Sequence, residues 1–435
     1  MRLVFLQEIR SLLIAPSLWI MLIIISLLLG YSFFQALALF SQASRTALSF
    51  PEMASGMNPL EGIFVPTFGA YYLSQTLLLP FVAIRLIGLD KQSGALKLLL
   101  QLPLSTFTLC GLKVTAMGFI WLLSLLPAIS AIFVWQNLGG HLYLPEIFLL
   151  LAGHGLYSLT VITIAMFAAT VSDSLPTAAM FCLAVTLGSW VLDFAAAGQT
   201  GLLATFGHFS LTAMLHQFES GLLASPLVVS FFALSLLFFL LTVIWLHPGQ
   251  RNLTRLKHSL ATLICISLTI YIAVLTPHYK DVTENRRHSF NPADSRALQS
   301  LHQPLTITIH LDPQDSRLLD MERDIFAKLR RNVPKLTMKY IQNTTDGLFN
   351  AATNDKYGLI IYEYNGQRSE TYSNSQQEIL PIIYKLAGIE VHPDSVPIYH
   401  GHPLVAVAGY SKWWFYIVLP FLFLCAAIAG RRGKW

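Results

Sequence analysis

Eight long stretches without a charged residue constrain this chain more than any other feature of its sequence. The first lies between Arg10 and Arg45. The other seven cover residues 62–84, 114–145, 147–172, 174–192, 220–250, 258–279 and 413–430. A membrane-spanning helix needs about 20 mostly apolar residues, which each stretch can supply. The sequence therefore predicts an α-helical polytopic membrane protein with about eight transmembrane helices.

Composition adds a second, polar part. Hydrophobic residues make up 54% of the 435 positions and charged residues 12%, roughly half the charged share of a soluble domain. About half of all charges fall between residues 280 and 385, which predicts one polar domain inserted between spans. The net charge of +5 does not indicate nucleic-acid binding, because the basic residues outside this domain flank apolar stretches. All four cysteines lie in or beside apolar stretches, so no disulfide framework is implied.

The basic residues also set the expected orientation. If the N-terminus is cytoplasmic, the short outer loops contain Arg45 alone among basic residues. The loops on the cytoplasmic side contain Lys91, Lys97, Lys113, Arg251, Arg255, Lys257, Arg431, Arg432 and Lys434. By the positive-inside rule both termini are expected in the cytoplasm and residues 281–411 outside it.

Four segments follow from this pattern. Residues 1–250 are expected to form a six-span domain that begins with an interfacial helix. Residues 251–280 form a cytoplasmic linker and a seventh span, residues 281–411 an extracytoplasmic α/β domain, and residues 412–435 an eighth span with a basic cytoplasmic tail. Residues 195–224, too polar for a full crossing, are expected to form short re-entrant or surface helices.

Within the polar domain, side-chain periodicity predicts strands and helices in turn. Residues 305–311 alternate as in a half-buried strand, and residues 318–329 repeat at helical spacing. Asn365-Gly366 lies between two strand-like runs and favours a tight hairpin turn. A helix is expected from about Gln376, with Pro381 marking either a kink or a later start.

The loop of residues 90–113 contains a leucine cluster ended by Pro103. Lys97 and Gln101 share one helical face, and the opposite apolar face is expected to consist of Leu96, Leu99, Leu100 and Pro103. This pattern predicts a short cytoplasmic helix whose apolar side enters a groove of a partner protein. The alternative is an ordinary solvated loop between two spans.

This loop resembles the first cytoplasmic loop of permeases of type-2 ABC exporters, which reads roughly acidic-x-x-x-Gly-Thr-x-x-x-Leu-Leu-x-x-Pro-x-Ser. Asp90 and Ala95 stand where the family usually has Glu and Thr, so Ala95 lacks the hydroxyl that could cap the helix. The resemblance implies that the loop couples to an ATPase. The residues assigned to this coupling are Asp90, Gly94, Leu96, Leu98, Leu99, Pro103, Ser105 and Lys113.

Two further segments resemble transporters associated with gliding motility and with nitrous oxide reductase maturation. Residues 207–221 are similar to the segment before the sixth span of those permeases. Residues 281–311 are similar to the opening of the auxiliary domain in the partner subunit of gliding-type transporters, although the domain here is much shorter. The resemblance implies a type-2 ABC permease fused to a shortened auxiliary domain, located in the bacterial inner membrane.

The function implied is that of a permease subunit that uses ATP hydrolysis by a separate ABC ATPase for export or for mechanical work outside the cytoplasm. This chain has no P-loop, since its one Gly-Lys dipeptide is Gly433-Lys434. It is therefore expected to bind no cofactor and to be no enzyme by itself, with ATP and Mg on the partner ATPase. Other expected partners are a second copy or related permease, membrane lipid and a periplasmic protein, but no nucleic acid. The alternative is a non-transporting membrane anchor or assembly factor that acts on an outer partner.

Four ionisable residues are candidates for a substrate path or gate: Arg85, Asp193, His208 and His216. For the two histidines, a packed or interfacial role is favoured over a ligand role. Arg85 and Asp193 stand at span ends, where a purely structural role is the simpler interpretation. His400 and His402 form a weak metal pattern without cysteine, and a loop returning to the membrane is favoured there, so no metal site is predicted. No catalytic triad, Glu pair or His-Glu-x-x-His motif stands out, and an intramembrane enzyme is not indicated.

Overall fold

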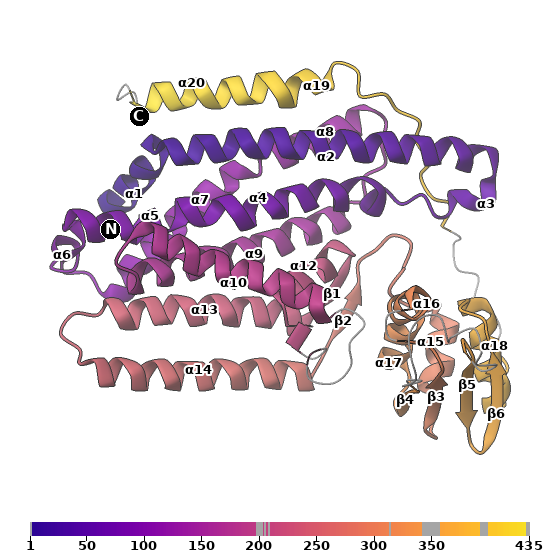
Figure 1. Ribbon diagram of the computed structural model, residues 1–435. Helices are drawn as coiled ribbons and strands as arrows, with labels where there is room; N and C mark the ends of the chain where they lie inside the picture. Colours follow the sequence, from indigo (N-terminus) through magenta and orange to yellow (C-terminus); the bar gives the residue numbers. More distant parts are fainter. Residues whose placement is uncertain are drawn as a thin grey trace. The chain divides into compact units, whose positions relative to one another are not determined.

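The computed structural model describes residues 2–196, 203, 206–207, 209–312, 315–341, 357–391 and 399–431. The chain divides into two compact units (Figure 1). The first, here called the membrane unit, consists of Met1–Val191, Ser210–Val282 and His400–Trp435. The second, here called the sheet unit, consists of Leu192–Phe209 and Thr283–Tyr399. Each unit has a hydrophobic core of its own.

Eight helical stretches among the described residues are long and apolar enough to cross a membrane, which confirms a polytopic helical membrane protein. The first is α2 (Pro16–Ser49) alone, and the second joins η1 (Leu60–Phe64), α4 (Val65–Ala83) and α5 (Arg85–Ser93). The remaining stretches are α7 and α8 (Thr106–Ser124 and Leu126–Asn137), α9 (Leu144–Val171), α10 (Leu175–Ala196), α13 (Ser225–Leu246), α14 (Asn252–Leu275), and α19, η4 and α20 (Ser411–Trp413, Trp414–Val418 and Leu419–Arg431).

The first and last spans are neighbours although they lie at opposite ends of the sequence. Helix α20 runs beside α2 in Figure 1, and the two are in contact. The Ser26 hydroxyl donates a hydrogen bond to the Phe415 carbonyl oxygen at 2.8 Å. Gly30 permits this approach, since a Cβ there would lie 2.6 Å from the Phe415 Cβ. The closing span is therefore an integral part of the membrane unit.

The centre of the membrane unit is α9, which contacts α4, α13 and the short helix α12 (Leu211–Glu219). Helix α14 lies at the edge beside α13 (Figure 1), and Ile266 is the one buried residue of its 24. Such a helix turns nearly all of its apolar side chains away from the protein. This is the arrangement expected where lipid replaces the core.

The segment before the sixth span contains α12, followed by β1 (Leu222–Ala224), which pairs in antiparallel fashion with β2 (Tyr279–Asp281). The Ser210 hydroxyl caps α12 by accepting a hydrogen bond from the Ala213 amide at 3.0 Å. With nine residues α12 is too short to cross a bilayer. The expectation of a short helix is met for this part, while residues 197–202, 204–205 and 208 lie outside the described residues.

The described residues of the sheet unit form a four-stranded sheet in the order β4-β3-β5-β6. Strand β3 (Leu305–Ile309) is parallel to β4 (Leu336–Tyr340) and antiparallel to β5 (Ile360–Tyr364), which is antiparallel to β6 (Gln367–Thr371). The accompanying helices are α15 (Pro292–Gln299), α16 (Ser316–Met321), η2 (Glu322–Phe326), α17 (Ala327–Asn332) and α18 (Gln376–Ala387).

Local sequence explains several of these elements. The alternating burial along β3 matches its alternating apolar residues. Asn365 and Gly366 both have positive φ, 50° and 77°, as a tight turn between β5 and β6 requires. Helix α18 begins at Gln376 after the Ser375 cap, so Pro381 lies inside the helix and is not its start. Helix α1 (Arg2–Ile14) and the short helix α3 (Pro51–Ala54) also belong to the membrane unit, and α1 contacts α7.

Candidate functional site

The loop with the leucine cluster forms two short helices joined by a sharp turn. Helix α5 ends at Gly94, whose φ of 78° lies in the left-handed region that glycine tolerates best. Helix α6 (Ala95–Leu99) begins directly afterwards. The hydroxyl that Ala95 lacks is partly replaced by Ser93, whose Oγ accepts a hydrogen bond from the Ala95 amide at 3.4 Å. Residues 85–105 are here called the elbow.

The leucines of the elbow divide differently from the expectation. Leu96 turns inward and joins the core of the membrane unit, so it does not belong to the projecting face. Leu98 is 68% exposed and Leu102 40% exposed, whereas Leu99 is half-buried. Because α6 has only five residues, its direction is set by the turn at Gly94 rather than by a long amphipathic face. The exposed apolar edge of the elbow therefore consists of Leu98 and Leu102.

The end of the elbow is shaped by Pro103 and Ser105, both exposed. Ser105 caps α7, since its Oγ accepts a hydrogen bond from the Thr108 amide at 3.1 Å. Its position in the loop pattern thus has a local structural reason, namely the start of the third span.

A buried ionic cluster joins the elbow to two other helices. The Lys113 side chain on α7 is 1% exposed. Its Nζ donates at 2.6 Å to Glu8 Oε1 on α1, at 2.6 Å to Asp90 Oδ2 on α5, and at 2.6 Å to the Leu86 carbonyl oxygen. All three ammonium donors are used. Glu8, Asp90 and Lys113 are here called the lysine triad.

The lysine triad holds two carboxyl groups around one ammonium group. Burial raises the pKa of Glu8 above its ordinary value, and the attraction of Lys113 opposes that shift. Removing the lysine would leave two acids close together in a partly dry environment. The cluster thus fixes α1 and α5 to the third span.

Two more contacts hold the elbow in place. Lys91 Nζ donates to the carbonyl oxygens of Thr170 and Ser172 at 3.0 and 2.7 Å, at the C-terminal end of α9. A cation is favoured there because the last carbonyl groups of a helix lack partners. Gly88 lies so close to Leu175 that a Cβ would be 2.3 Å from its Cδ2. The base of the elbow is therefore tied to α7, α9 and α10.

The four residues assigned to a substrate path or gate do not form one cluster within the described residues. Arg85 is half-buried at the start of α5, and His216 lies on α12 with a side chain that is 56% exposed. Asp193 lies near the end of α10 and groups with the sheet unit. His208 lies outside the described residues.

A buried pair of ionisable residues in the membrane unit was missed by the sequence analysis. His154, in the middle of α9, is fully buried, and Glu219, at the end of α12, is 4% exposed. His154 Nε2 lies 3.1 Å from Glu219 Oε1, and His216 Nε2 lies 3.9 Å from Glu219 Oε2. His154 and Glu219 are here called the His–Glu pair.

The His–Glu pair is close but poorly satisfied. Three buried atoms of the pair make no aligned hydrogen bond to any residue that the structure describes: both ring nitrogens of His154 and the Oε1 of Glu219. Aromatic rings surround the imidazole, with the Phe68 and Tyr71 ring centroids 5.1 and 5.5 Å from its own. A buried polar group in a membrane protein is costly, which makes it a functional candidate.

A chain of uncharged polar groups begins beside this pair. Tyr71 and Ser124 share a hydrogen bond of 2.8 Å between their hydroxyl groups. Gln75 donates to the Ser124 Oγ at 3.2 Å and accepts from the Ser158 hydroxyl at 3.4 Å. This network joins α4, α7 and α9 at the centre of the membrane unit, where it can orient polar groups without any net charge.

One signal in the sequence could have revealed the pair. His154 stands between Gly153 and Gly155 inside an apolar stretch, a position that a count of formal charges ignores. A Cβ on Gly153 would lie 2.5 Å from the Phe218 Cβ, so the glycine lets α12 approach α9 closely. A histidine flanked by glycines within a span indicates close backbone approach at a polar group.

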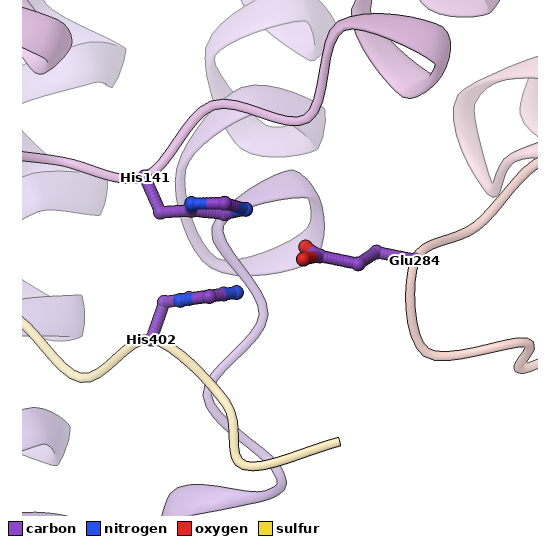
Figure 2. A group of neighbouring side chains, drawn as sticks. All are labelled: His141, Glu284 and His402. Carbon is purple, nitrogen blue, oxygen red and sulfur yellow. The ribbon is translucent and has the colours of Figure 1, made fainter. Parts of the chain in front are cut away.

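His402, from the weak metal pattern, stacks on His141, which lies in the loop between the third and fourth spans (Figure 2). The ring centroids are 3.6 Å apart with an interplanar angle of 16°. Glu284, also drawn, belongs to the sheet unit. The contact joins a loop to the segment before the last span.

Comparison of the chain with protein-family models, with curated proteins and with solved structures finds no match in any of the three. A functional conclusion therefore rests on the residues of this chain.

Proposed function

We propose that this chain is the membrane subunit of an ATP-driven transporter of the type-2 ABC exporter class, with ATP hydrolysis performed by a separate ATPase. The observation that carries this proposal is the elbow. It presents the exposed edge of Leu98 and Leu102 while its base is fixed by buried ionic contacts. A rigid projection of this kind can pass the movement of a partner to the spans behind it.

The location of the elbow supports the same conclusion. Lys91 contacts the end of α9, and the lysine triad contacts α1 and α7. A displacement of the elbow would therefore act on several spans together, including α9, which carries His154. The absence of a P-loop from the sequence agrees with an ATPase on another polypeptide.

The proposal includes an orientation and a set of partners. The distribution of lysine and arginine favours a cytoplasmic elbow, cytoplasmic termini and a sheet unit outside the cytoplasm, in a bacterial inner membrane. A second copy of this chain or a related permease would complete the transporter.

A second candidate function is a membrane anchor that transmits force to an outer partner without transporting a substrate. The observation that favours it is the separate core of the sheet unit, formed entirely by residues 290–389. A domain with its own core between the seventh and eighth spans is suited to hold a partner protein. Substrate movement across reconstituted vesicles distinguishes the transporter from the anchor.

A matched pair of substitutions tests the proposed contact with the ATPase. Leu98→Asp places a charge on the apolar edge, and it is expected to cost several kcal/mol of association, about a hundredfold or more in affinity. Leu253→Asp is the control, because Leu253 is 65% exposed, close to the 68% of Leu98, but lies at the start of α14. The measurement is the amount of ATPase that co-purifies with each variant. Equal retention by Leu98→Asp and Leu253→Asp would contradict the proposal.

A further inference from the structure

The turn between α13 and α14 carries a positive charge that nothing in the described chain compensates. Arg251, Arg255 and Lys257 lie within seven residues, while residues 220–280 contain no Asp or Glu. None of the three side chains forms an ion pair with any residue that the structure describes. The turn is therefore a cationic patch, and an anion from outside the chain is its natural complement.

Two of the three cations share one face of α14. Arg251 and Arg255 are four residues apart, a spacing at which side chains on a helix are neighbours. The Arg255 guanidinium donates a hydrogen bond at 3.1 Å to the His247 carbonyl oxygen at the end of α13, which uses one of its five N–H groups. Lys257 follows two residues later, about 200° further round the helix. The arginines thus offer several N–H donors together, and Lys257 stands apart from them.

The depth of this face matches the layer of lipid phosphates. Helix α14 has 24 residues, about 36 Å at a rise of 1.5 Å per residue, whereas the hydrocarbon core of a bilayer is about 30 Å thick. All three cations lie in or before the first two turns of the helix, so this end is the one that extends into the headgroup layer. Both leaflets have phosphates at this level, and the inference therefore holds for either orientation of the chain.

The surroundings of the arginines favour a lipid over a soluble anion or an acidic protein surface. Leu256 and Leu260 are exposed on the same helix, and Ile266 is the one buried residue of α14. An anion at this turn therefore lies next to hydrocarbon. A phospholipid supplies a phosphate and apolar chains in one molecule, whereas a soluble anion would leave the exposed leucines uncovered.

We propose that Arg251 and Arg255 bind the phosphate of an anionic phospholipid, whose acyl chains lie along the exposed surface of α14. Hydrogen bonds from guanidinium to phosphate are charge-assisted, and they are about twice as strong as those between neutral groups. A zwitterionic lipid fits less well, because its ammonium group would approach two arginines with no carboxylate among residues 220–280 to receive it. The site therefore selects for net negative charge.

Arg251→Gln and Lys257→Gln provide a matched test. Both residues are exposed and lack a side-chain partner among the described residues, and each substitution removes one positive charge. A phosphate held by the arginines is weakened by the first change alone, whereas a general attraction between charges is weakened equally by both. The expected loss of affinity is about fivefold for Arg251→Gln, the share of one basic residue near an anionic surface, and less than about twofold for Lys257→Gln.

The measurement is native mass spectrometry of the purified full chain as phosphatidylglycerol or, separately, phosphatidylethanolamine is added. The wild type is expected to retain one saturable phosphatidylglycerol molecule and to bind phosphatidylethanolamine at least about tenfold more weakly. Equal binding of the two lipids, or equal losses in the two variants, would overturn the proposal. Inorganic phosphate that displaces the bound phosphatidylglycerol would overturn the assignment to a lipid.

A double variant, Arg251→Gln with Arg255→Gln, extends the test to both donors. The two losses should multiply to roughly 25-fold, and a double variant that binds phosphatidylglycerol as the wild type does would contradict the proposal. Because lipid binding is measured without an ATPase, the result does not depend on the proposed transport function.

Discussion

The lysine triad and the His–Glu pair are both clusters of ionisable side chains inside the membrane unit, but their hydrogen bonding differs. In the triad, Lys113 donates to two carboxylates and one carbonyl oxygen, each at 2.6 Å. In the pair, His154 and Glu219 lie 3.1 Å apart, and both nitrogens of His154 lack an aligned hydrogen bond to the described residues.

This difference distinguishes a cluster that holds its helices in place from one whose side chains can change partners. A fully satisfied network holds its helices in one arrangement, because any displacement breaks several strong bonds together. A poorly satisfied pair can accept a proton, a substrate group or a new neighbour at less cost. We infer that the triad positions the elbow, while the His–Glu pair takes part in changes within the spans.

The largest expected effect is that of Lys113→Met. This substitution keeps a long unbranched side chain but leaves Glu8 and Asp90 without their cation. It should destabilise the membrane unit by about 3–5 kcal/mol, the usual cost of breaking a buried ion pair on one side. The measurement is the denaturation midpoint of the purified chain in detergent.

A neutral triad provides the control for that experiment. In the triple variant Glu8→Gln, Asp90→Asn, Lys113→Met, no charge remains buried, so most of the lost stability should return. If the triple variant is as unstable as Lys113→Met alone, the loss comes from packing and not from unpaired carboxylates.

A smaller effect on stability is expected for Glu219→Gln. The change keeps the shape of the side chain and removes its charge, and no well-aligned bond to His154 is lost. Unfolding should therefore shift by less than about 1 kcal/mol, whereas ATP turnover by the complex with the ATPase should fall. His216→Gln is the control, since that ring is 56% exposed. A loss of stability as large as that of Lys113→Met would remove the distinction between the two clusters.

The smallest effect concerns a partly exposed ion pair of the sheet unit. Hydrogen bonds from Arg317 lower the pKa of Asp315 from 3.8 to about 2, with a further contribution from the Tyr357 hydroxyl. A lowered pKa means that the unfolded state binds more protons as pH falls below about 4, so this stabilisation is present above pH 4 and is lost toward pH 2.

Asp315→Asn should therefore destabilise the sheet unit slightly at pH 7, and the difference from the wild type should shrink as the pH falls from 4 to 2. Arg317 is half exposed, which keeps the effect small. Thermal unfolding of a fragment with residues 283–399 measures it, and the core of that fragment consists of its own residues. A difference that stays constant from pH 7 to pH 2 would show that Asp315 contributes through its shape and not its charge.

The spans were predictable from sequence because an apolar stretch of sufficient length has few alternatives to a membrane helix. The strand β3 and the turn at Asn365 and Gly366 were equally predictable. A half-buried strand requires alternating apolar residues, and a turn with positive φ favours asparagine and glycine. The start of α18 was left open at Pro381, and the Ser375 cap settled it.

The site was less predictable, because side-chain direction depends on tertiary contacts. Leu96 and Leu98 are nearly adjacent, yet Leu96 is buried and Leu98 exposed. The lysine triad joins residues separated by 105 and 23 positions, a separation that no local pattern reports. His154 escaped notice because a search for formal charges passes over histidine.

The most direct test of the proposed coupling is the ATP hydrolysis rate of the complex reconstituted in lipid discs, compared between Leu98→Asp and Leu253→Asp. We expect the chain with Leu253→Asp to stimulate its ATPase as the wild type does, whereas Leu98→Asp, still folded in the membrane, should leave only the basal rate. Stimulation that is equal in the two variants would show that the elbow does not couple this chain to an ATPase.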